Sequence, residues 1–331
     1  FAAAERLEGI DEQSASAGNS VSARRAYLRA ATYFAASTTF LDGTKYPSRS
    51  LPASKRHLGC WESFCAHLNP PAEQVGIPYE GASIPGYFFR PDEAPERRTT
   101  IIFNNGSDGA TCGMWTGGVA GALERGYSAL VFDGPGQNAM LWLKNIPFRH
   151  DWERVITPVV DFLLDREDVD PGRIALSGIS QGGYWVLRAL AFEHRIAAGI
   201  VDPAVMDVSE SFLRELPGEM RGLLDAGREQ EFNEAMNEGL RQAGDADVFL
   251  SLHRAGVEIL GIRLHRHGRQ VVHCCHDGDC LCEPFRQHGR RSAADVDLAE
   301  AVAHVRNSAD LFLQRRKVPG RAVLAELDPV E

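Results

Sequence analysis

The sequence Ser-Gly-Ile-Ser-Gln-Gly-Gly at residues 177–183 joins an apolar segment, Arg-Ile-Ala-Leu at 173–176, to a longer one, Tyr-Trp-Val-Leu-Arg-Ala-Leu at 184–190. The first segment is typical of a buried strand and the second of a helix. A serine on the sharp turn between a strand and a helix exposes its hydroxyl at the sheet edge. Its neighbours must be small because the helix turns back close to the strand, and glycines stand on both sides. We therefore interpret Ser180 as a nucleophile.

The start of the helix after Ser180 suits a developing negative charge. Unpaired backbone N–H groups and the helix macrodipole both favour an anion at a helix N-terminus. The N–H of Gln181 is then placed to stabilise an oxyanion on a carbonyl that Ser180 attacks. The alternative is a Gly/Ser-rich turn without chemistry. That alternative does not account for the strand and helix on either side of the turn.

Length and composition limit the classes of protein. The chain has 331 residues, of which 44% are hydrophobic and 24% charged, as in ordinary globular proteins. It is long enough for one large α/β domain with insertions or for two domains. A net charge of -10 argues against a nucleic acid or an anionic membrane as partner. We find no apolar run of bilayer length and no basic-then-apolar leader, so we expect a soluble, cytoplasmic protein.

Strand-like and helical segments alternate between residues 75 and 207. This alternation predicts βαβ units and a mostly parallel sheet with helices on both faces. Further upstream the pattern is helical and strand signals are missing, so residues 1–74 are expected to form an N-terminal helical segment. The predicted strands lie at 75–78, 86–90, 100–103, 128–132, 173–177 and 198–201, and the clearest helices at 21–37, 57–68 and 151–166.

Two segments of different character follow the last predicted strand. Residues 208–250 have a helical pattern and are a candidate lid, because loops at the carboxyl ends of strands carry function in such sheets. The alternative is a helix packed on the flank of the sheet. Residues 253–331 hold seven of the eleven histidines and four of the seven cysteines. A shift of the coding frame upstream would produce such an atypical tail. With both segments included, the core is expected to span 75–331.

Several motifs, in order along residues 22–207, resemble an α/β-hydrolase family. This family contains 2,6-dihydroxypseudooxynicotine hydrolase, the fermentation–respiration switch esterases and fungal polyketide-shortening hydrolases. The resemblance implies the α/β-hydrolase fold, with N-terminal helices and core enclosing the site. It also implies cleavage of an ester or of a carbon–carbon bond next to a ketone. Besides the Ser180 turn, the motifs are Ser-Ala-Arg-Arg-Ala-Tyr-Leu-Arg-Ala at 22–30, Ile-Pro-Tyr-Glu-Gly at 77–81, Pro-Gly-Tyr at 85–87, Asn-Gly-Ser-Asp at 105–108, Glu-Arg-Gly-Tyr at 124–127, Phe-Asp-Gly-Pro-Gly-Gln at 132–137, Asp-Trp-Glu at 151–153, Val-Asp-Pro-Gly-Arg-Ile at 169–174 and Phe-Glu-His-Arg at 192–195.

Both reactions need the same catalytic groups. A serine attacks the carbonyl, a histidine removes its proton, and an aspartate orients the histidine. The second oxyanion donor should come from the loop after the strand at 100–103, where a backbone N–H near Gly106 or Ser107 is available. We choose Ser107. Asp133, after the strand at 128–132, is expected to hold an Asx-type turn rather than to react.

The chain order Ser…Asp…His places the other two groups late in the sequence. Residues 271–279 are the stretch that resembles a strand followed by an acid, so Asp279 fits best. For the base, His288 in a loop-like Gln-His-Gly and His304 in a helical run are both available, and we choose His304. His194 lies near the far end of the helix after Ser180, about 20 Å along its axis, and is expected at the surface.

No cofactor is implied by this chemistry. The Cys/His cluster at 273–282 does not have the usual spacing of a zinc site, so we expect no metal. The expected partner is a small-molecule substrate, without nucleic acid or membrane. A homodimer is compatible with the sequence, which carries no independent sign of one. The alternative function is a hydrolase-like protein with an incomplete triad that acts by binding.

Overall fold

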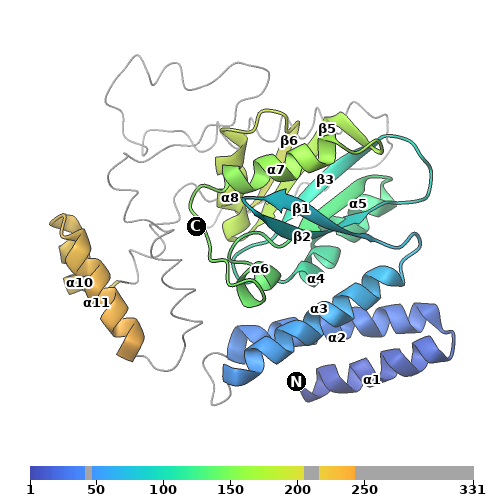
Figure 1. The fold of residues 1–331 in the computed structure, drawn as a ribbon, viewed down its shortest axis with the longest axis horizontal. Coiled ribbons are helices and arrows are strands. Elements are labelled where there is room, and N and C mark those ends of the chain that lie inside the picture. Colours follow the sequence, from blue (N-terminus) through green and yellow to red (C-terminus); the bar gives the residue numbers. More distant parts are fainter. Residues whose placement is uncertain (42–46, 205–215, 243–331) are drawn as a thin grey trace, which may run out of the picture.

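A six-stranded mixed sheet forms the centre of this computed structural model, which describes residues 1–41, 47–204 and 216–242 (Figure 1). Its spatial order is β1-β2-β4-β3-β5-β6. The pairs β1/β2 and β2/β4 are antiparallel, whereas β4, β3, β5 and β6 run parallel. Each of the six strands predicted between residues 75 and 201 is confirmed, and the parallel arrangement holds for four of them. The strand-like stretch at 271–279 lies outside the described residues. The strands are β1 (Glu73–Tyr79), β2 (Ala82–Phe89), β3 (Arg98–Asn104), β4 (Ser128–Phe132), β5 (Val169–Ile179) and β6 (Ala198–Asp202).

Helices cover both faces of the sheet. All residues of β3 and β4 are buried, which is typical of parallel strands covered on both sides. One face carries α7 (Glu153–Leu164) and α8 (Gln181–Leu190). The indole ring of Trp152, the residue just before α7, stacks on that of Trp185 in α8, with the ring centroids 3.9 Å apart. On the other face lie α4 (Thr111–Met114), a π-helical turn (Trp115–Val119) and α5 (Ala120–Glu124), together with the N-terminal helices.

The three N-terminal helices pack together below the sheet in the view of Figure 1, with α3 against α6. They are α1 (Ala2–Ser16), α2 (Ser20–Leu41) and α3 (Ser50–Ala66), the last preceded by a 3₁₀ turn (Pro47–Arg49). The helix α3 begins earlier than the predicted residue 57, because a proline at 52 is tolerated in a first turn. Its Trp61 ring meets Tyr87 of β2 edge-on at 5.6 Å.

A buried histidine joins two of these helices. The Nδ1 atom of His57 on α3 lies 3.0 Å from the carbonyl oxygen of Ala31 on α2. Burial lowers the pKa of His57 to about 4, so the ring is neutral at physiological pH. We assign His57 a structural role.

Helices α10 (Gly218–Asp225) and α11 (Glu229–Gln242) fall within the segment predicted as a lid. They pack on each other, and Figure 1 shows them to the left of the core. A lid over Ser180 stays a prediction, as do the domain boundaries. No helix of the described residues combines the length and the apolarity that crossing a bilayer requires.

The turn after β4 contains a buried carboxyl group. The backbone N–H of Asp133 donates to the carbonyl oxygen of Pro85, and its Oδ2 accepts the N–H of Ala139 at 3.2 Å, in the first turn of α6 (Asn138–Trp142). The predicted Asx-type turn is wrong in detail, because the residue two positions on is Pro135 and has no N–H to donate. Burial raises the pKa of Asp133 to about 7.

Replacing Asp133 by asparagine should stabilise the protein increasingly as the pH rises. The Asp133→Asn amide keeps an oxygen for the Ala139 N–H but carries no charge. In the unfolded chain the carboxyl ionises near its usual pKa of 3.8, whereas in the folded chain it holds its proton to about pH 7. Wild type therefore loses stability relative to the variant across this window, by on the order of 4 kcal/mol. Urea unfolding at pH 4, 6 and 8 measures the difference. A difference that does not change with pH would contradict the assignment.

Candidate active site

The carboxyl ends of the parallel strands lie side by side at one edge of the sheet. The register pairs Phe132 of β4 with Asn104 of β3, and Asn104 with Gly178 of β5. The loops that leave these strands therefore start at the same level. In open α/β sheets, ligands bind at this edge.

Ser180 stands at a sharp bend on this edge. The strand β5 ends at Ile179, α8 begins at Gln181, and Ser180 between them has φ 57° and ψ -129°. A positive φ is strained for a residue with a side chain. The conformation is held by a hydrogen bond of 2.6 Å from the Ser180 N–H to the carbonyl oxygen of Asp202 on β6. Ser180 is exposed. The predicted bend is confirmed.

The glycines around Ser180 are required by close approaches. A Cβ on Gly178 would lie 2.2 Å from the carbonyl oxygen of Gly182, where the helix turns back over the strand. A Cβ on Gly183 would lie 2.0 Å from the carbonyl oxygen of Pro203. Since real Cβ atoms do not come this close to backbone, no larger residue fits without moving the bend.

The loop after β3 touches the Ser180 side chain. A Cβ on Gly106 would lie 2.9 Å from the Ser180 Cβ and 3.3 Å from its Oγ. The N–H of Gly106 already donates to Oδ1 of Asn105 at 2.9 Å, so it is not free for an oxyanion. Among the described residues, the N–H groups of Ser107 and Gln181 have no recorded acceptor. Within the described part of the chain both predicted donors are thus unpaired. Gln181 directly follows Ser180, and Ser107 directly follows Gly106, which lies against the Ser180 side chain.

A network of buried amide side chains holds this loop. Asn104 accepts the indole N–H of Trp152 at 3.1 Å and donates from Nδ2 to the carbonyl oxygen of Asn105. Nε2 of Gln137 donates to the carbonyl oxygens of Asn105 and Gly106 at 2.8 and 2.9 Å. Sequence reasoning gave these amides no role. A signal was present, because two consecutive asparagines directly after an apolar strand must find hydrogen-bond partners when buried.

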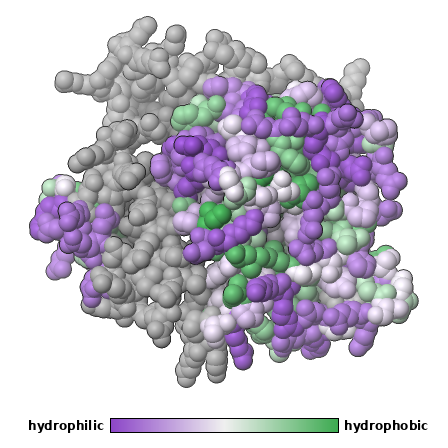
Figure 2. All heavy atoms as spheres, in the orientation of Figure 1, coloured by the Kyte–Doolittle hydropathy of each residue, from purple (hydrophilic) through white to green (hydrophobic). Residues whose placement is uncertain are grey.

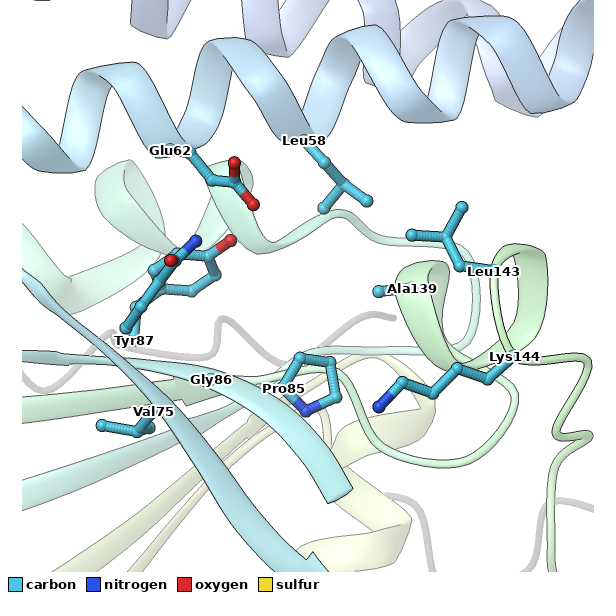
Figure 3. A pocket seen from close by; sticks show the side chains of 10 residues that line it. Leu58, Glu62, Val75, Pro85, Gly86, Tyr87, Ala139, Leu143 and Lys144 are labelled. Carbon is cyan, nitrogen blue, oxygen red and sulfur yellow. The ribbon is translucent and has the colours of Figure 1, made fainter. Parts of the chain in front are cut away.

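A cavity of about 370 Å³ opens between α3, the start of β1, the middle of β2 and α6 (Figure 3). Figure 3 shows Glu62 and Leu58 reaching down from α3, with Val75 and Pro85 below them and Leu143 and Lys144 at the right. Apolar side chains gather near the middle of this face of the molecule, with hydrophilic ones around them (Figure 2). Burial raises the pKa of Tyr87, which lines the cavity, so its hydroxyl stays protonated. The β2 residues of the cavity are separated from β5 by β4 and β3 in the sheet.

The described residues hold one member of the predicted triad. Asp279 and His304 lie outside them, as do His288 and the Cys/His cluster at 273–282, so their roles stay predictions. His194 is exposed after the end of α8, as expected. Within the described part of the chain no group of three His, Cys, Asp or Glu side chains is arranged to hold a metal ion.

The chain is similar in sequence to proteins that are named as hydrolases. Residues 124–242 match the model of the prolyl oligopeptidase family, peptidase S9. A 20-hydroxy-prefusarin hydrolase of Gibberella moniliformis is 34% identical over 222 residues, which are 65% of this chain and 53% of the relative. An alpha/beta hydrolase of Xenoacremonium sinensis is 34% identical over 236 residues, 68% of this chain and 54% of that protein. The chain thus spans about half the length of the curated relatives it matches.

A solved structure agrees with these matches. The crystal structure of 2,6-dihydroxy-pseudo-oxynicotine hydrolase is similar with a TM-score of 0.59 and 23% sequence identity, covering 82% of this chain and 70% of that one. At this identity the likeness speaks for the fold. The strand order, the bend at Ser180 and the sequence matches together show that the described part of the chain has the α/β-hydrolase fold.

Proposed function

We propose that this protein is a serine hydrolase in which Ser180 attacks the carbonyl carbon of a small organic substrate. The observation that carries the proposal is the strained, glycine-walled bend at Ser180, which holds an exposed side chain against Gly106 and directly before the N-terminus of α8. A strained conformation that the surrounding structure maintains is typical of functional sites. The sequence similarity to α/β hydrolases gives independent support.

The proposed reaction has two steps. In the first, the Ser180 hydroxyl loses its proton to a histidine, and Oγ bonds to the carbonyl carbon. The oxyanion that forms accepts hydrogen bonds from the N–H groups of Gln181 and Ser107. It collapses to an acyl-enzyme as the leaving group departs with the proton. In the second step water replaces Ser180 by the same route, which releases the acid. We propose His304 as the base and Asp279 as the residue that orients it.

The substrate is proposed to be an ester or a ketone whose neighbouring carbon–carbon bond is broken by water. Relatives named for their action on small molecules, such as the 20-hydroxy-prefusarin hydrolase, support this class. Turnover of p-nitrophenyl acetate compared with that of a 1,3-diketone separates the two reactions. Neither reaction needs a cofactor.

The second candidate is a hydrolase-like protein that binds without turning over. The atypical composition of residues 253–331, where the proposed acid and base lie, favours it. The labelling experiment below distinguishes the two candidates, because a binding protein with an incomplete triad has no base to activate Ser180.

Replacing Ser180 by alanine should abolish covalent labelling by a fluorophosphonate probe. The probe phosphonylates an activated serine, and Ser180→Ala removes the oxygen that would be modified. Ester turnover should fall about 10³-fold or more. The matched control is Ser63→Ala on α3, which removes an exposed hydroxyl bonded within its own helix and should label like wild type. If the wild-type protein is not labelled, the enzyme proposal is wrong and the binding protein is favoured.

Replacing Gly106 by alanine should slow labelling of Ser180 strongly. The new methyl group would lie 3.3 Å from the Ser180 Oγ, so it displaces either the hydroxyl or the loop. We expect a loss of about 100-fold in the labelling rate constant. Gly113→Ala is the control, because a Cβ there meets nothing within 4 Å. Equal rates for the two variants would show that the loop after β3 does not shape the site.

A further inference from the structure

We propose that Gln137 is a positioning residue that sets the direction of the Ser107 N–H beside Ser180. The inference rests on the proposed function of Ser180. Its basis is a set of three hydrogen bonds made by one fully buried amide side chain.

The orientation of the Gln137 amide follows from its partners. Oε1 accepts the N–H of Gly134 at 2.8 Å, and Nε2 donates to the carbonyl oxygens of Asn105 and Gly106. Because an N–H can only donate and a carbonyl can only accept, the flipped amide would lose all three bonds. The side chain is therefore locked between the turn after β4 and the loop after β3.

Peptide geometry carries this constraint to the proposed oxyanion donor. The carbonyl oxygen of Gly106 and the N–H of Ser107 belong to one peptide unit. That unit is trans, since the described cis bonds are those before Pro70 and Pro203. In a planar trans peptide the C=O and the N–H point in opposite directions. By holding the Gly106 oxygen, Gln137 therefore aims the Ser107 N–H away from itself.

A second contact ties the same two segments. Nδ2 of Asn138 donates to the carbonyl oxygen of Gly109 at 3.2 Å. The loop is thus attached near both of its ends to the start of α6. The contact at Gly109 lies beyond Ser107, so it limits drift of the loop but does not orient the Gly106–Ser107 peptide. That task falls to Gln137.

Removing the Gln137 amide should therefore displace the Ser107 N–H while leaving Ser180 in place. A displacement of about 1 Å at a reacting group costs about 100-fold in rate. We expect Gln137→Met, which has similar length but no hydrogen bonds, to lower the second-order rate constant for fluorophosphonate labelling of Ser180 about 30- to 100-fold. For p-nitrophenyl acetate the loss should appear in kcat with KM little changed, because the oxyanion forms only in the transition state.

The control is Val160→Ala, which opens a cavity at a fully buried position of α7. It should lower the melting temperature without slowing labelling. If Gln137→Met labels as fast as Val160→Ala, the inference is wrong. If wild type itself takes no label, the proposed function fails instead, so the two failures are distinguishable.

Gln137→Glu supplies a signature that a merely structural role would not show. A protonated carboxyl has one O–H to donate to the loop carbonyls, whereas the ionised form has none. The labelling rate of Gln137→Glu divided by that of Gln137→Met should therefore rise as the pH falls from 8 to 6. Taking the ratio cancels the titration of the base. A ratio that stays flat would overturn the inference.

Discussion

The close approach of α8 to the end of β5 is the constraint on which the rest of the site depends. The backbone of Gly182 passes so near Gly178 that no side chain fits between them, and Ser180 takes a positive φ as a result. A hydrogen bond from the Ser180 N–H to β6 holds this strained conformation. The exposed position of the hydroxyl is thus a consequence of how strand, helix and neighbouring strand pack.

The loop after β3 is organised by a different kind of force. There, buried amides replace close packing, because the carbonyl groups of Asn105 and Gly106 turn inward and must be paired. Gln137 and Asn104 supply the donors, and Trp152 donates to Asn104 from the face of the sheet that carries α7. Rigid packing therefore positions the proposed nucleophile, and a polar network positions the proposed oxyanion donor. The two meet where Gly106 contacts Ser180.

Much of the fold could be predicted because its signals are local. The strands β3 and β4 are buried along their length, as are residues 174–176 of β5, and the stripe of Ile156, Val159, Val160 and Leu163 on α7 is fully buried. The antiparallel edge of the sheet could not be predicted in this way, since strand direction depends on partners far apart in sequence. The prediction of an Asx-type turn at Asp133 was wrong because the carboxyl group accepts its hydrogen bond from a backbone N–H six residues away, at the start of α6.

By itself the sequence determined the order of strands and helices and the bend at Ser180, because periodicity and glycine spacing act over a few residues. Tertiary structure alone decided that the N–H of Gly106 is taken while that of Ser107 is unpaired among the described residues. It alone brought Gln137 to the loop, across more than thirty positions of chain. Hydrogen-bond partners of buried backbone are chosen by the packing of whole elements, and no local pattern records that choice.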